Sequence, residues 1–161
     1  MTTSATLTAL TLTAAGLAAA WDVRTRKIPN WLTFTAFLLG VTLNAFGAGL
    51  SGLGIAVFGM LAGVALLLVP FAMGGMGAGD VKILGAVGAM NGATFAFRAF
   101  LYGSIAGGFL AVAVIIMNWT CGLVLKKDCA RPAGLRRMGP RNTFPYGVAI
   151  FAGTVAAYIL R

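Results

Sequence analysis

The sequence contains no histidine and very little negative charge. Histidine is absent from all 161 residues, and only three residues are acidic: Asp22, Asp80 and Asp128. Without histidine, Ser-His-Asp and Cys-His catalysis are excluded and the commonest zinc ligand is missing. The two cysteines, Cys121 and Cys129, match no CxxC metal or redox motif. An enzyme with this sequence must therefore take its acid–base groups from a very short list.

Charged residues of either sign are scarce. Only 9% of the residues are Asp, Glu, Lys or Arg, whereas a soluble domain carries about 25%. Hydrophobic residues make up 60% of the chain, and the mean hydropathy is +0.94. A water-soluble fold of this size could not bury so much apolar surface. We therefore expect an integral membrane protein.

Apolar runs of membrane-spanning length recur along the chain. A helix needs about 20 mostly apolar residues to cross the ~30 Å hydrocarbon core of a bilayer. The sequence predicts six such spans within a single domain, residues 1–161: 5–21, 31–48, 53–72, 81–97, 99–125 and 144–160. The glycine pairs Gly59/Gly63 and Gly103/Gly107 are typical of positions where helix backbones approach closely. The expected fold is an all-α bundle of six transmembrane helices.

The basic residues, which give a net charge of +9, lie in two clusters between the apolar runs. The first cluster is Arg24, Arg26 and Lys27, and the second is Lys126, Lys127, Arg131, Arg136, Arg137 and Arg141. Neither contains the interleaved aromatics expected of a nucleic-acid site. We interpret both as orientation signals and lipid-headgroup anchors, with no nucleic acid as partner. The positive-inside rule then predicts an N-out, C-out protein of the inner (plasma) membrane.

Two of the acids stand at the edge of an apolar run. Asp22 directly follows the first run, and Asp80 opens the fourth. The predicted orientation puts both at the cytoplasmic face. A carboxylate within a spanning helix costs about 2.5–3.5 kcal/mol on insertion scales, so such residues are usually functional or paired. Asp128 lies among basic residues, which favours an ordinary solvated loop charge.

A pair of carboxyl groups at one membrane face predicts aspartic proteolysis. Two carboxyls within hydrogen-bond reach share a proton. The ionised one can take a proton from water while the protonated one polarises a peptide carbonyl. This chemistry needs no histidine, metal or cofactor, so we predict Asp22 and Asp80 as the catalytic pair. A Ser–Lys dyad is the other arrangement to weigh, but Ser4, Ser51 and Ser104 fall away from the cytoplasmic lysines.

The glycines before Asp80 favour an irregular loop beside the carboxylate. Gly74, Gly75, Gly77 and Gly79 lack side-chain bulk and tolerate positive φ angles. Irregular backbone is tolerated at membrane depth where it lines a watery cavity. An extended peptide could lie against such a loop, and we expect Gly77 and Gly79 to shape the site.

Three further residues are candidates for shaping the site. Lys82 follows Asp80 by two residues, so on a helix it points to a different side. It either pairs with an acidic group of the substrate or reaches lipid headgroups. Asn30 is predicted to cap the second helix, and Pro145 is predicted to start the last one.

Three segments together resemble a known family. Residues 22–30, Asp-Val-Arg-Thr-Arg-Lys-Ile-Pro-Asn, resemble the first-aspartate segment of the prepilin peptidases. Residues 74–82, Gly-Gly-Met-Gly-Ala-Gly-Asp-Val-Lys, resemble the second, the GxGD motif shared with preflagellin peptidases and, more distantly, presenilin-like proteases. Residues 145–147, Pro-Tyr-Gly, resemble the family's C-terminal element. The resemblance implies that Asp22 and Asp80 cut the leader from type IV prepilin-like or pseudopilin precursors at the cytoplasmic face.

The sequence also departs from the larger members of that family. Those members carry a further cytoplasmic segment with paired cysteines, which is associated with N-methylation of the new pilin terminus. This sequence has no such segment, so it is similar to the small peptidases of Flp/Tad-type pili and methyl transfer is not expected. The alternatives are a preflagellin-type peptidase, a small proton- or cation-coupled transporter, or a non-catalytic assembly scaffold. The precursor and the oligomeric state are left open.

Overall fold

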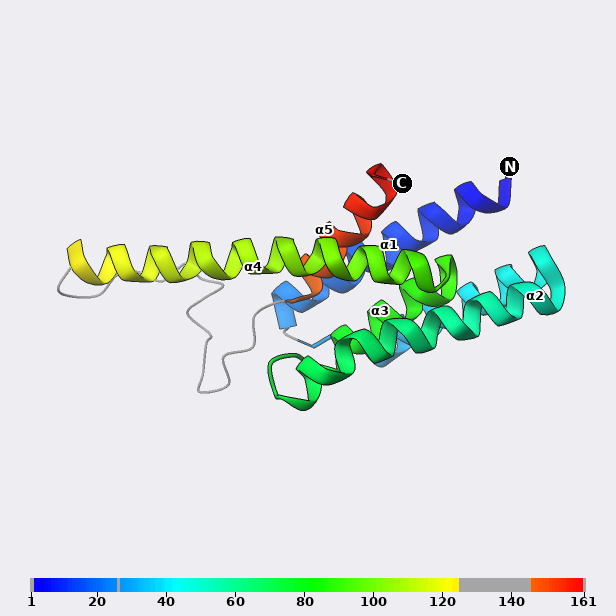
Figure 1. Ribbon diagram of the computed structural model, residues 1–161, viewed down its shortest axis with the longest axis horizontal. Helices are drawn as coiled ribbons and strands as arrows, with labels where there is room; N and C mark the ends of the chain where they lie inside the picture. Colours follow the sequence, from blue (N-terminus) through cyan, green and yellow to red (C-terminus); the bar gives the residue numbers. More distant parts are fainter. Residues whose placement is uncertain (1, 26, 125–145, 161) are drawn as a thin grey trace.

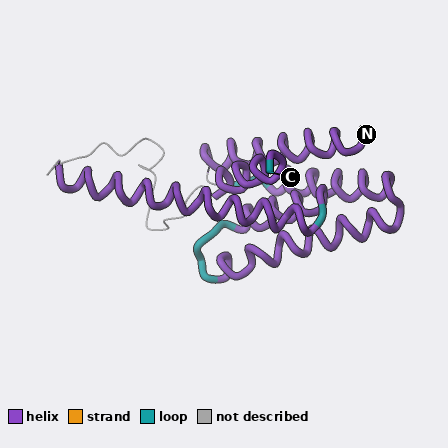
Figure 2. Tube along the Cα trace, turned by 45° about the horizontal axis from the view of Figure 1, so that its top comes forward, coloured by secondary structure: helices purple, strands orange, loops and turns teal. Residues whose placement is uncertain are grey.

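The computed structural model describes residues 2–25, 27–124 and 146–160, and every regular element among them is a helix (Figures 1 and 2). The helices are α1 (Thr2–Thr25), α2 (Asn30–Ala72), α3 (Ala78–Asn91), α4 (Ala93–Val124) and α5 (Tyr146–Ile159). Among the described residues, three segments are long and apolar enough to cross a membrane: Ala5–Thr25, Asn30–Ala72 and Ala93–Ala113. The predictions of an all-α fold and of a membrane protein are confirmed.

Several predicted features lie outside the residues whose positions or side chains are described. They are Arg26, the whole second basic cluster, Asp128, Cys129, Pro145 and the side chain of Cys121.

The 43-residue α2 contains two of the predicted spans, 31–48 and 53–72, in one element. Its helical geometry is interrupted at Ala48 and Gly49, and Gly49 has φ 59°, a conformation that glycine adopts readily. Figures 1 and 2 show α2 folding back on itself at this point. We call residues 30–47 the first arm and residues 50–72 the second arm. A Cβ at Gly52 would collide with the backbone of Asn44, so the two arms pack closely beyond the bend.

The predicted limits of the fourth and fifth spans, 81–97 and 99–125, are wrong. α3 ends at Asn91, and Gly92 adopts φ 86° and ψ 171°, which breaks the helix. The residues from Ala93 onwards belong to α4. The apolar composition continues across Gly92, so hydropathy alone could not place the boundary.

α3 is the central helix of the bundle. Every residue from Asp80 to Met90 is buried except Lys82. A helix that is apolar around its whole circumference belongs in a protein interior. It packs most extensively against α2 and also contacts α1, α4 and α5. The apolar core around it includes Leu32, Leu67, Ile83, Leu84, Val87, Met90 and Ile150.

Glycines set the distance between the packed helices. A Cβ at Gly59 would collide with the carbonyl of Gly88, and one at Gly63 would lie 2.5 Å from the carbonyl oxygen of Leu84. On the other side of the bundle, a Cβ at Gly103 would lie 3.0 Å from the carbonyl oxygen of Ala149. The prediction of close backbone approach is confirmed for these three glycines, whereas Gly107 meets the side chains of Tyr146 and Ala149.

A polar network joins α1, α3 and α5 at one end of the bundle. The Asn91 side-chain amide donates to Thr11 Oγ1 at 2.8 Å, and the Tyr158 hydroxyl donates to Asn91 Oδ1 at 2.6 Å. Figure 1 shows the two chain termini on this side of the bundle. The loop at residues 73–77 and the C-terminal end of α1 lie at the opposite end, where the candidate site is found.

Candidate active site

Asp22 lies in the last turns of α1 and is almost completely buried, with 7% of its surface exposed. Its Oδ2 accepts a hydrogen bond of 3.0 Å from the backbone N–H of Gly147. Because Gly147 belongs to the first turn of α5, this bond ties together two helices that are far apart in the sequence.

Gly147 approaches Asp22 too closely for any other residue type to fit without movement. A Cβ at this position would lie 3.0 Å from Asp22 Oδ2 and 3.1 Å from Asp22 Cβ. The preceding residue fixes the same turn, because the Tyr146 hydroxyl lies 3.3 Å from Ser104 Oγ on α4. Sequence reasoning did not single out Gly147 as a site residue. The signal that could have found it is the glycine directly after Pro145 and Tyr146.

Asp80 lies in the first turn of α3 and is 5% exposed. Its Oδ2 accepts a 3.2 Å hydrogen bond from the backbone N–H of Gly77, the N-cap residue, as in a capping box. Its Oδ1 is buried and has no hydrogen-bond partner within the described part of the chain. Native structures rarely leave a buried carboxyl oxygen in this state.

Asp22 and Asp80 line the same cavity, which has a volume of about 290 Å³. We call it the aspartate cavity. Its walls come from the end of α1, the connection to α2 and the start of α3, and consist of Asp22, Lys27, Ile28, Asn30, Gly77, Ala78, Gly79, Asp80 and Lys82. The structure thus brings together the two acids that the sequence pairs. Lys27 and Ile28 are wall residues that sequence reasoning did not include.

Burial, and after it the negative charge of Asp22, raises the pKa of Asp80, whereas the hydrogen bond from Gly77 lowers it. Together these effects place the pKa of Asp80 at about 7. Asp80 lies outside the three long apolar segments, at the end of the bundle. At neutral pH its carboxyl is therefore protonated in a substantial share of the molecules.

The glycines before Asp80 form a loop only in part. Residues 73–77 are non-helical, with Gly74 at φ 76°. Gly79, by contrast, belongs to the first turn of α3, so its predicted place in an irregular loop is wrong. A Cβ at Gly79 would lie 2.8 Å from the Ile28 Cβ. Gly79 shapes the cavity by letting Ile28 pack against α3.

Asn30 and Lys82 lie on the wall of the cavity and bind each other. The Lys82 ammonium donates to Asn30 Oδ1 at 2.9 Å. The predicted cap role of Asn30 is wrong, because the N-cap of α2 is Pro29 and no side chain caps this helix. Lys82 lines the same cavity as Asp80 although it stands two residues further along the helix.

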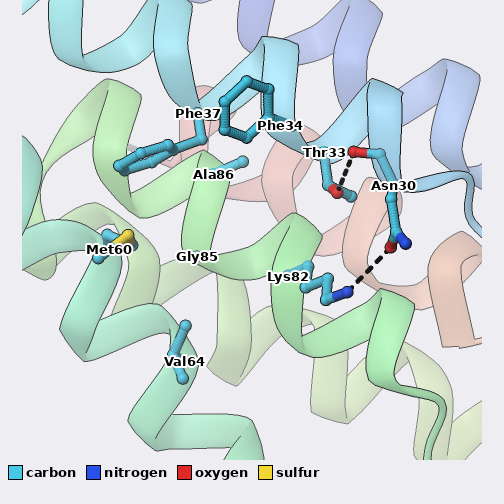
Figure 3. Close-up of a pocket in the computed structure, with 9 residues that line it drawn as sticks. All are labelled: Asn30, Thr33, Phe34, Phe37, Met60, Val64, Lys82, Gly85 and Ala86. Carbon is cyan, nitrogen blue, oxygen red and sulfur yellow. Dashed lines mark hydrogen bonds between the residues drawn. The ribbon is translucent and has the colours of Figure 1, made fainter.

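A second cavity adjoins the first and is mainly apolar. It has a volume of about 270 Å³ and lies between the two arms of α2 and α3 (Figure 3). We call it the apolar cavity. Its lining residues are Asn30, Thr33, Phe34, Phe37, Met60, Val64, Lys82, Gly85 and Ala86. Asn30 and Lys82 therefore line both cavities.

The fold and the site together define an all-helical membrane protein with two buried carboxyls in one cavity. Among the described side chains, no group of three or more His, Cys, Asp or Glu residues could hold a metal ion. The chemistry available to the aspartate cavity is acid–base chemistry by the two aspartates, with Lys27 and Lys82 as the neighbouring cations.

Comparison with protein families matches residues 9–112 with the type IV leader peptidase family. The match covers more than half of the chain and contains both aspartates, so the chain belongs to this family, as the sequence resemblance predicts. Membership implies an aspartic protease and prepilin-type substrates. Comparisons with curated proteins and with solved structures gave no match.

Proposed function

We propose that this protein is an intramembrane aspartic endopeptidase that removes the leader peptide from type IV prepilin-like precursors, with Asp22 and Asp80 as the catalytic pair. The observation that carries the proposal is the shared aspartate cavity, in which Asp80 Oδ1 has no partner among the described residues. Family membership supports the same activity.

The two carboxyls have surroundings suited to different roles. The Gly147 N–H stabilises a carboxylate on Asp22, so Asp22 is the general base. Burial favours the protonated form of Asp80, so Asp80 is the general acid. The proposed reaction requires one ionised and one protonated carboxyl, as in other carboxyl pairs of this kind.

The reaction follows from these roles. Asp22 takes a proton from a water molecule as the water oxygen attacks the scissile carbonyl carbon, and Asp80 gives its proton to the carbonyl oxygen. The resulting diol collapses when Asp22 passes its proton to the amide nitrogen and the C–N bond breaks. Asp80 then recovers a proton from the remaining hydroxyl, so the pair returns to its starting state. No step needs a metal or cofactor.

We further propose that the bundle crosses the inner membrane six times, with both termini outside. The bend at Ala48 and Gly49 divides α2 into two antiparallel arms, each long enough for one crossing. Trp21 and Trp31 pack edge to face with ring centroids 6.1 Å apart at the aspartate end, and tryptophan is enriched at membrane interfaces. Arg24 and Lys27 at this end favour the cytoplasmic side.

The substrate follows from this placement. We expect a single-pass precursor with a basic leader in the cytoplasm and an apolar helix in the bilayer. The peptide bond between the leader and the mature part of such a precursor lies at the aspartate end. We propose the small peptidases of Flp/Tad-type pili as the functional class of this protein.

Incubation of the purified protein in detergent with a synthetic prepilin-like precursor tests the proposal. We expect a cleaved leader on a precursor gel shift, with no added metal or cofactor. A preflagellin-type peptidase would instead cleave only preflagellin-like precursors. A protein that moves protons or cations across vesicles but leaves every precursor intact is a transporter, and that result would overturn the proposal.

A further inference from the structure

The helices on one side of the bundle are shorter than a bilayer is thick. α3 and α5 have 14 residues each, or about 21 Å at 1.5 Å per residue, whereas the hydrocarbon core is about 30 Å thick. Both start at the aspartate end, where Asp80 and Gly147 belong to their first turns. They also end together, because the Tyr158 hydroxyl donates to Asn91 Oδ1. Helices of this length that start at one face of the bilayer end about 9 Å short of the other face.

The helices on the other side of the bundle are long enough. α1 has 24 residues, or about 36 Å, and the second arm of α2, residues 50–72, covers about 34 Å. Figures 1 and 2 show the bend of α2 and the N-terminus reaching further from the aspartate end than the start of α4. A bilayer accommodates short helices by thinning locally. We therefore expect the leaflet opposite the aspartates to be drawn down towards the start of α4.

Arg98 lies in this part of α4. It belongs to the apolar segment Ala93–Ala113, its side chain is exposed, and it makes no hydrogen bond or ion pair with a described residue. An arginine within a membrane-spanning segment is costly, so it normally pairs with another group or marks a binding site. The partner of Arg98 therefore comes from outside the described part of the chain.

Arg98 lines a small cavity together with Asn91, Thr94 and Phe95, with a volume of about 150 Å³. We call it the Arg98 cavity. Thr94 precedes Arg98 by four residues, so the two side chains are neighbours on one face of α4. The Asn91 amide already donates to Thr11. The Arg98 guanidinium and the Thr94 hydroxyl are thus the donors that this cavity offers to an anion.

An apolar groove adjoins the Arg98 cavity. It has a volume of about 570 Å³, and its lining residues from the second arm of α2 and from α4 are Ala62, Ala65, Leu66, Ala93, Thr94 and Phe97. We call it the α2–α4 groove. At 100° per residue, Arg98 lies about 40° from Thr94 around the helix, and Phe97 lies about 60° from Thr94 in the opposite direction. The cavity and the groove therefore lie on the two sides of Thr94, which lines both.

We propose that Arg98 and Thr94 bind the phosphate of an anionic phospholipid from the leaflet opposite the aspartates, with one acyl chain in the α2–α4 groove. A guanidinium binds phosphate oxygens through paired hydrogen bonds, and the apolar groove suits a hydrocarbon chain. Free phosphate has no chain for the groove, and the apolar helix of a precursor has no anion for Arg98. This inference does not depend on the catalytic assignment.

Photo-crosslinking to lipid tests the proposal. Phe97 is exposed and lines the α2–α4 groove, so it is replaced by the photoreactive amino acid benzoylphenylalanine. The same replacement at Phe46, which is exposed beside the bend of α2, samples the same leaflet as a control. The protein is reconstituted in vesicles with equal amounts of phosphatidylglycerol and phosphatidylcholine, and mass spectrometry measures the ratio of the two lipids attached after irradiation.

We expect this ratio to be about fivefold higher at Phe97 than at Phe46, as for one cation acting on an anionic lipid. Arg98→Gln lowers the ratio at Phe97 to that at Phe46. Arg98→Lys retains part of the preference, because it keeps the charge but loses the paired hydrogen bonds. Unchanged circular dichroism shows that both variants are folded.

Three results would overturn the proposal. The first is an equal ratio at Phe97 and Phe46 in the otherwise wild-type protein, or a preference that survives Arg98→Gln. The second is loss of the preference on addition of inorganic phosphate but not of chloride at the same ionic strength, which would identify a free anion as the ligand. The third is loss of the preference on addition of a synthetic precursor, which would identify its helix as the occupant.

Discussion

Asp22 and Asp80 are both buried, yet their backbone partners come from different parts of the fold. Asp80 is held locally, by the N–H of Gly77 three residues before it. Asp22 is held by Gly147, which lies 125 residues away in the sequence. The position of Asp80 therefore depends on the start of one helix. The position of Asp22 depends on the packing of α5 against α1.

The raised pKa of Asp80 makes stability depend on pH. The folded protein holds this proton up to about pH 7, while the unfolded chain releases it near its ordinary pKa of 3.8. Stability from this group is therefore present below about pH 4 and is lost as the pH rises towards 7.

Asp80→Asn removes this pH-dependent loss of stability. In detergent, the thermal midpoint of Asp80→Asn should match that of the wild-type protein near pH 4 and exceed it by a growing margin up to pH 7. A margin that stays constant across this range would contradict the assignment.

The contact between Gly147 and Asp22 predicts a loss of activity from one added methyl group. Gly147→Ala pushes the Asp22 carboxyl away, and a misplacement of about 1 Å can cost about 100-fold in rate. We expect kcat for precursor cleavage to fall by about 10- to 100-fold. Gly108→Ala is the matched control, because a Cβ there meets nothing within 4 Å. Equal rates for the two variants would show that Gly147 does not position Asp22.

The sequence was sufficient to find the two acids but not the residues around them. Asp22 and Asp80 stand out because carboxylates are rare in so apolar a chain. Gly147 and Ile28 fall within segments that resemble the family, but their residue types do not mark them as site residues, since glycine and isoleucine are common in membrane helices. Their roles depend on contacts between distant segments. Asn30 was misread because its side chain binds Lys82, which lies 52 residues away, instead of its own helix.

The sequence predicted that the elements are helices, but it did not predict where each helix begins and ends. The apolar runs correctly predict helices, because any backbone within a bilayer must satisfy its hydrogen bonds internally, but the six predicted spans correspond to five helices among the described residues. Two of the breaks in helical geometry fall at single glycines. Gly49 and Gly92 adopt positive φ angles within continuous apolar sequence, and hydropathy does not distinguish them from the many glycines that pack within helices.

The close crossing of α2 and α3 predicts a strong difference between two glycines of the second arm. Gly59→Ala places a methyl group against the backbone of Gly88, whereas Gly54→Ala places one in open space. Overpacking of this kind costs about 1–3 kcal/mol. We expect Gly59→Ala to lower the thermal midpoint in detergent and Gly54→Ala to leave it unchanged or slightly raised. The packing account would be wrong if the two variants melted alike.

Considered as a whole, the molecule separates the aspartate end from an end held by the Asn91 network. Three segments meet at the aspartate end: the end of α1, the loop at residues 73–77 and the start of α5. The end of α1 and Gly77 of the loop line the aspartate cavity, and the start of α5 holds Asp22 through the N–H of Gly147. No short motif of the sequence contains the whole site.

The proposed orientation predicts which end of the bundle is accessible from outside the cell. In a protein whose Cys121 and Cys129 are replaced by serine, Ser51→Cys lies beside the bend of α2 and Thr25→Cys lies at the end of α1, both exposed. A membrane-impermeant maleimide added to intact cells should label Ser51→Cys and leave Thr25→Cys unlabelled until the membrane is opened. The reverse pattern would place the aspartates on the outer face.

The most direct test of the catalytic pair uses all three acids of the chain. The initial rate of precursor cleavage is measured for purified Asp22→Asn, Asp80→Asn and Asp128→Asn, each with confirmed membrane insertion. We expect the first two variants to lose at least about 1,000-fold of the wild-type rate, because each lacks one of the two proton-transfer groups, worth about 10²–10⁴-fold apiece. Asp128→Asn should cleave at the wild-type rate. Cleavage at that rate by either Asp22→Asn or Asp80→Asn would contradict the account.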